Sequence, residues 1–214
     1  MRKILRVAAA QTFAAAVVLT ALSAPANADT PESDAQIAAE WQTAWDTYHF
    51  TDTTPPAPDS GRSQVTNSIS VDIDSPMPLT FYKYSNFNNH IGKNPFLKRV
   101  ITHKECKQGS TTYRNLTAIE EIPYEGTIVV SKTHAQQRLH PTGFYYETDS
   151  WSEPNVVTHQ KIDFKSLPGG KTRVTENLTF ESDSSLIDFV AANGTASHQQ
   201  LQQALKQAIE SGEL

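Results

Sequence analysis

The end of the chain constrains the fold most strongly, because it has the pattern of one long amphipathic helix. From about Ser184 to Ser211, apolar residues recur at three- and four-residue steps and share one face: Leu201, Ala204, Leu205, Ala208 and Ile209. Several glutamines fill the opposite face. The apolar face needs a partner, and the segments before it alternate every second residue, which is the period of strands. A sheet curled around this helix is therefore expected.

Six strand candidates follow one another between residues 99 and 181, separated by short turns. They are Arg99–Lys107, Thr111–Ile122, Thr127–Arg138, Gly143–Ser150, Val156–Phe164 and Thr172–Glu181. An earlier strand, Ser68–Asp74, is followed by two short helical segments. Connections this short join only antiparallel neighbours. The sequence thus predicts an α+β fold in which a curved antiparallel seven-stranded sheet wraps around the C-terminal helix.

The first 28 residues have the pattern of a secretory signal peptide. Three basic residues among the first six precede an apolar run from Val7 to Leu22, and Ala26-Asn27-Ala28 places small residues at a cleavage site. The run is shorter than the roughly 20 apolar residues that a transmembrane helix needs. We expect cleavage after Ala28 and a secreted protein, extracellular or in the cell envelope, without a stable membrane anchor.

Charge and cysteine content exclude several classes of function. The net charge is −5 and becomes more negative when the basic signal peptide is removed, so no basic surface for binding nucleic acid is expected. Cys106 is the only cysteine, which rules out an intramolecular disulfide and any site built on several thiolates. No His-x-x-x-His motif and no glycine-rich phosphate loop occurs. We therefore expect neither a metal ion nor a cofactor.

Residues 29–63 have the pattern of a helical extension with a linker. Thr30-Pro31 is a favourable helix start, and one narrow apolar stripe follows it: Ile37, Trp41, Ala44, Trp45 and Tyr48. The helix either packs onto the main domain or docks a partner protein through Trp41 and Trp45. A proline-rich segment at residues 53–61 predicts a linker, and hence an extension separable from the main domain, residues 64–214.

Three stretches of the main domain have a layout found in one superfamily. They are the strand-to-helix stretch Ser70–Leu79, the start of the second strand at Asn94–Val100 and the helix end Leu201–Ile209. With the order of elements, they resemble the SRPBCC or START-like helix-grip superfamily, which includes START lipid-transfer domains, birch-pollen-type allergens and bacterial polyketide cyclases. The tryptophan common in the first helix of these proteins is replaced here by Phe81 and Tyr82.

The resemblance implies a cavity between sheet and helix that holds a small apolar or aromatic molecule. Ligand sites are usually concave and largely preformed, which a sheet curved around one helix would provide. The leading hypothesis is a secreted protein that binds an apolar or amphipathic ligand. One alternative is an enzyme of polyketide-cyclase type, a cyclase or dehydratase that uses acid and base residues in the pocket. Another is a ligand-free interaction module that acts through Trp41 and Trp45.

Strand alternation predicts which side chains point into the cavity. The inward sets contain six candidate ligand-binding residues: Phe144, Tyr146, Gln160, Ile162, Glu176 and Leu178. His134 is a seventh candidate whose side is open. It points inward if it shares the face of Ile128 and Val130, and outward if Val129 and Ala135 point inward. Arg114 has no assigned side for the same reason.

Glu176 is the strongest of these candidates, because a buried carboxylate is costly unless it is paired, protonated or solvated. In one interpretation it lies near the sheet rim, solvated or paired with a lysine. In the other it lies inside the pocket with a raised pKa and accepts a proton or orients a polar ligand. The remaining histidines carry less weight: His103 and Glu105 form a same-face surface pair, while His90 and His198 lie in a loop and on a polar helix face.

Overall fold

The computed structural model describes residues 32–124 and 127–214, so the predicted signal peptide lies outside the described residues. In chain order the helices and strands are α1 (Asp34–Tyr48), β1 (Arg62–Ile73), α2 (Met77–Tyr84), η1 (Phe87–His90), β2 (Leu97–Gln108), β3 (Thr111–Tyr124), β4 (Thr127–His140), β5 (Tyr145–Ser152), β6 (Val156–Leu167), η2 (Pro168–Gly170), β7 (Lys171–Asp183) and α3 (Ile187–Glu210). Within the described part of the chain, no helix is long and apolar enough to cross a membrane.

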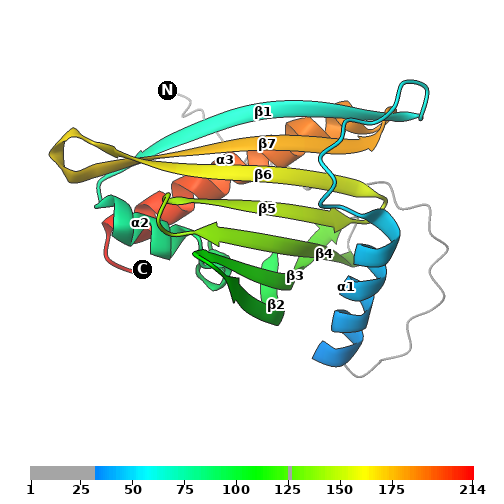
Figure 1. Ribbon diagram of the computed structural model, residues 1–214, viewed down its shortest axis with the longest axis horizontal. Coiled ribbons are helices and arrows are strands. Elements are labelled where there is room, and N and C mark those ends of the chain that lie inside the picture. Colours follow the sequence, from blue (N-terminus) through cyan, green and yellow to red (C-terminus); the bar gives the residue numbers. More distant parts are fainter. Residues whose placement is uncertain (1–31, 125–126) are drawn as a thin grey trace, which may run out of the picture.

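All seven strands form one antiparallel sheet in the order β1-β7-β6-β5-β4-β3-β2. Figure 1 shows this sheet curving around α3, with α2 and the C-terminal end of α3 at one end of the molecule. The two sheet edges, β1 and β2, do not pair with each other, so the sheet stays open. The predicted α+β helix-grip arrangement is therefore confirmed. β1 begins at Arg62 rather than Ser68, because its first half pairs with the end of β7.

The apolar stripe of α3 lies against the sheet, as its periodicity predicts. Leu205 is fully buried and belongs to a core cluster with Val71, Ile162 and Val174. Near the start of the helix, a Cβ on Gly194 would lie only 2.5 Å from the Phe180 ring. The absence of a side chain there lets α3 approach β7 closely. Burial of the stripe is thus the main contact between the helix and the sheet.

Helix α1 begins at Asp34, later than Thr30-Pro31 predicts, because Ser33 forms its N-cap. The Ser33 side chain accepts a hydrogen bond from the Gln36 backbone, and Gln36 Oε1 accepts one from the Ser33 backbone at 2.8 Å. This reciprocal pair is a capping box, which satisfies two amide groups that the first helical turn would leave unpaired.

The aromatic stripe of α1 packs against the outer face of the sheet, opposite α3. Trp41 is 4% exposed, stacks on Trp45 with ring centroids 5.0 Å apart, and donates from Nε1 to the Ala135 carbonyl at 2.9 Å. Ala44, Phe50, Trp151 and Val157 belong to the same cluster. The first interpretation of the helix, packing onto the main domain, is correct. Because Trp41 is buried against its own domain, the alternative of a partner protein docked through Trp41 and Trp45 is not supported.

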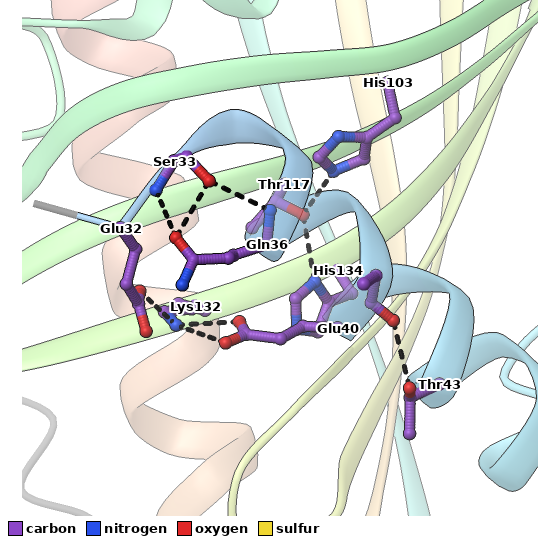
Figure 2. A network of polar contacts seen from close by, with 10 residues as sticks. Glu32, Ser33, Gln36, Glu40, Thr43, His103, Thr117, Lys132 and His134 are labelled. Atoms are coloured by element: carbon purple, nitrogen blue, oxygen red, sulfur yellow. Dashed lines mark hydrogen bonds and ion pairs between the residues drawn. The ribbon is translucent and has the colours of Figure 1, made fainter.

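Ion pairs also hold α1 and the residues just before it against β4 (Figure 2). Lys132 pairs with Glu32 at 2.5 Å and with Glu40 at 2.7 Å. Beneath the helix, Thr117 Oγ1 lies 2.8 Å from His103 Nε2 and 2.9 Å from His134 Nδ1. Burial lowers the pKa of His134 to about 4, so the ring is neutral at neutral pH.

Replacing Leu205 by aspartate is expected to unfold the domain. A carboxylate buried against the sheet costs several kcal/mol, comparable with a typical total stability of ~5–15 kcal/mol. Chemical denaturation monitored by circular dichroism checks this, with Gln203→Asp on the exposed side of the same helix as the control. A Leu205→Asp protein as stable as the control would contradict the packing of α3.

Replacing Trp41 by alanine is expected to lower the free energy of unfolding by about 3–5 kcal/mol, the usual cost of removing a buried tryptophan. The exposed neighbour Thr47, changed to alanine, serves as the control. If α1 were only tethered by the proline-rich linker, both variants would have the thermal midpoint of the unchanged protein.

Candidate ligand-binding site

A cavity of about 310 Å³ lies between the inner face of the sheet and α3. Its walls are largely apolar and include Leu116, Ala118 and Leu201, with Val190 near the start of α3. Polar side chains also line it, among them four on β5, β6, β7 and α3: Thr148, Gln160, Glu176 and His198. An apolar space with a few convergent polar groups is the usual form of a small-molecule site.

Three of the predicted site residues line this cavity: Tyr146, Gln160 and Glu176. Ile162 and Leu178 point to the same side but are fully buried in the core beside it. Phe144 lies outside the strand predicted for it, because its φ of 49° is left-handed and β5 begins only at the next residue. Its ring packs edge-on against Phe81 in the core, at a centroid distance of 5.7 Å.

His134 lies on the outer face of the sheet and does not line the cavity. Ser131, Thr133 and Ala135 line it instead, so the residues between them point toward α1. This settles the open alternative in favour of the outward side. Periodicity could not decide, because α1 covers the outer face and both faces of β4 are buried.

A β-bulge corrects the expectation for His103. The pairing of β2 with β3 shifts register between Thr102 and Lys104, so the strict alternation stops at His103. His103 points to Thr117 under α1, whereas Glu105 pairs with Arg114 at 2.5 Å beside a hollow on the inner face. The two residues are therefore not a same-face surface pair.

Glu176 is the centre of the polar set. It is 3% exposed, and its two carboxylate oxygens accept hydrogen bonds from three side chains. Oε1 accepts from the Tyr84 hydroxyl and from Gln202 Nε2 at 3.1 Å, while Oε2 accepts from His198 Nδ1 at 3.0 Å. The carboxylate therefore links β7 to α2 and to α3.

The burial of Glu176 rules out the solvated rim position. Its position in the pocket agrees with the other interpretation, but its pKa is lowered rather than raised. Burial alone raises the pKa of this carboxyl. The hydrogen bond from His198 and the positive charge of the protonated imidazole lower it. The hydrogen bonds from Tyr84 and Gln202 lower it further, so the pKa falls below its usual value. Glu176 is thus neither a solvated rim residue nor a protonated acid, but a buried carboxylate held ionised by its partners.

His198 and Gln202 are the residues that sequence reasoning missed. They lie one turn apart on α3, and with Leu205 they continue its buried stripe toward the N-terminus. Their spacing from Leu205 could have predicted that they face the sheet, but because they are polar they were assigned to the solvent face. His198 Nδ1 donates to Glu176, and its Nε2 accepts from Gln160 Nε2 at 3.3 Å. The second ring nitrogen thus reaches the cavity.

His90 and Glu120 are also among the titratable groups that line the cavity. His90 Nε2 donates to the Tyr84 carbonyl at 2.8 Å, and burial lowers the pKa of His90 to about 4. Burial raises the pKa of Glu120, whose Oε1 accepts from Asn94 Nδ2 at 2.8 Å. Among residues 32–124 and 127–214, no three His, Cys, Asp or Glu side chains are placed to hold a metal ion.

The chain matches no family model and no curated protein, but solved structures share its fold. The Zhui aromatase/cyclase from Streptomyces sp. R1128 has a TM-score of 0.56 at 11% identity, over 69% of this chain and 94% of its own. A START superfamily protein from Mycobacterium smegmatis has a TM-score of 0.53 at 16% identity, over 68% and 97%. Ara h 8.0201 has a TM-score of 0.52 at 13% identity, over 70% of this chain and 99% of its own. The fold is SRPBCC or START-like, as the sequence predicts.

Replacing Glu176 by glutamine is expected to destabilise the protein at pH 7 by about 1–3 kcal/mol, because charge-assisted hydrogen bonds are lost. A lowered folded-state pKa gives stability that is present above the unfolded value, near 4.5, and lost as the pH falls through the folded value. The deficit of the variant should therefore shrink below about pH 4.5.

Urea denaturation between pH 3 and 7 measures this, with the exposed Glu121→Gln variant as the control. A Glu176→Gln variant more stable than the unchanged protein at pH 7 would indicate a raised pKa and contradict the pairing.

Proposed function

We propose that this protein binds a small amphipathic molecule in the cavity between the sheet and α3. The observation that carries the proposal is the Glu176–His198–Gln160 cluster at one wall of an otherwise largely apolar space. The apolar walls favour a hydrocarbon or aromatic body, since burying such surface contributes roughly 25 cal/mol per Å². The polar cluster favours one polar group on that body.

The partners of Glu176 indicate the kind of polar group. Three side chains already satisfy the carboxylate, so it does not need a cation from the ligand. The groups nearest the cavity are the Gln160 amide and the Nε2 nitrogen of His198, whose side chain is 22% exposed. The amide donates and accepts, and the unprotonated imidazole nitrogen accepts, so both pair well with an uncharged hydroxyl. The proposed ligand is therefore neutral at this end.

The sequence supports the proposal that the protein acts outside the cytoplasm. The basic start, apolar run and Ala26-Asn27-Ala28 site support export and cleavage after Ala28. A binding protein outside the cytoplasm would then carry or retain a poorly soluble molecule. The fold neighbours described as an aromatase/cyclase and as a START superfamily protein support a small-molecule ligand of this general kind.

A second candidate function is acid–base catalysis of the polyketide-cyclase type. It is favoured by one geometric feature: Glu176 accepts a hydrogen bond from His198 Nδ1, so the basic lone pair is on Nε2, which accepts from Gln160 at the cavity wall. In that case Nε2 would take a proton from a bound substrate, and Glu176 would orient the ring. His198→Gln would then abolish turnover while binding persists.

Native mass spectrometry of the protein secreted by its own cells tests the binding proposal. We expect a non-covalent adduct of small mass that is released on denaturation. Ala118→Phe, which places a ring in the cavity, should lose the adduct, whereas the exposed Gln203→Asp variant should keep it. An adduct held equally by Ala118→Phe, or none in any sample together with no binding of apolar probes, would overturn the proposal.

A further inference from the structure

Three polar side chains form a row across the inner face of the sheet. Gln137 on β4 pairs with Thr148 on β5, and Thr148 pairs with Gln160 on β6. Because paired residues on neighbouring strands point to the same face, all three lie on the side of the ligand cavity. Gln160 belongs to the Glu176–His198 cluster, so the row extends that cluster toward the middle of the sheet.

The other two members of the row have unused hydrogen-bonding capacity. Gln137 is fully buried and donates from Nε2 to the Ser85 carbonyl at 2.9 Å, but its Oε1 accepts no hydrogen bond from the described residues. Thr148 is 3% exposed, and its Oγ1 also has no partner among them. A buried polar atom left unsatisfied costs about 1–3 kcal/mol, so two adjacent ones are unusual in a packed core.

Both groups border open space. Thr148 lines the main cavity, while Gln137 lines an adjoining hollow of about 380 Å³ between α2, η1 and the strands β2 to β4. Phe87, Val100 and Leu116 line both spaces. Gln137 and Thr148 therefore lie where the two spaces meet, within reach of a molecule that fills the main cavity.

We propose that Gln137 and Thr148 form a second polar binding point that takes a hydroxyl group of the ligand. This rests on the proposed function. Gln137 Oε1 only accepts, so the ligand must donate a proton there, whereas the Thr148 hydroxyl donates in return. A hydroxyl does both, and a carbonyl or ether oxygen does not.

The ligand accordingly has polar groups at two ends. One end contacts His198 and Gln160, and the hydroxyl contacts Gln137 and Thr148. Gln137 and Gln160 are two strands apart, a separation of roughly 10 Å between their backbones. This is comparable with the length of a fused two-ring compound.

Calorimetry with naphthalene, 2-naphthol and 2,6-dihydroxynaphthalene tests the inference. In the unchanged protein, the diol should bind about tenfold more tightly than 2-naphthol, the gain expected from one well-satisfied buried hydroxyl. Thr148→Val keeps the shape but removes the hydroxyl, and should bring the two affinities within about twofold. Thr158→Val, in the wall of the same cavity, is the matched control and should keep the preference.

Thermal unfolding of the ligand-free variants gives a second readout. Removing a hydroxyl that has no protein partner should leave the midpoint of Thr148→Val unchanged or raise it, whereas a structural hydroxyl would lower it. A diol preference that persists in Thr148→Val, or is absent from the unchanged protein, would overturn the inference. It would indicate that Gln137 and Thr148 bind only water. Failure of all three probes to bind would instead overturn the proposed function itself.

Discussion

The buried carboxylate of Glu176 is the interaction on which the interior of this protein depends. A lone charge at 3% exposure would cost several kcal/mol, and the chain meets that cost with donors from two different helices. Tyr84 at the end of α2 and His198 and Gln202 on α3 are thereby fixed against β7. The same contacts that satisfy the charge thus position both helices on the inner face of the sheet.

This arrangement explains how α3 both closes the core and lines a cavity. The C-terminal half of its stripe, from Leu205 to Ile209, is tightly packed, whereas the half that carries Gly194 and His198 borders open space. Polar side chains that face the interior need hydrogen-bond partners within the protein, and Glu176 is the partner of His198 and Gln202. The outer face is closed separately by α1, so the two layers on either side of the sheet have different roles.

Much of the fold could be predicted from the sequence, because period-2 and period-3.6 patterns report burial directly. Alternation placed Glu176, Gln160 and Tyr146 on the inner face correctly. It failed where burial is not one-sided, as for His134 between the sheet and α1, and where a bulge interrupts it, as at His103. His198 was missed because a polar residue on a helix is assigned to solvent unless its buried partner is known. Pairing across 22 residues is a tertiary contact, and no local pattern encodes it.

The pKa of the Glu176 carboxyl tests this account most directly. Carbon-13 NMR of protein labelled at the glutamate carboxyl carbons, with Glu176→Gln for assignment, follows its titration. If Glu176 is paired as described, its midpoint lies below the ordinary value of 4.5 and moves upward in His198→Ala, where burial is no longer opposed by the imidazole. A midpoint above 4.5 that does not change in His198→Ala would show that the carboxyl is buried without these partners, and would contradict the account.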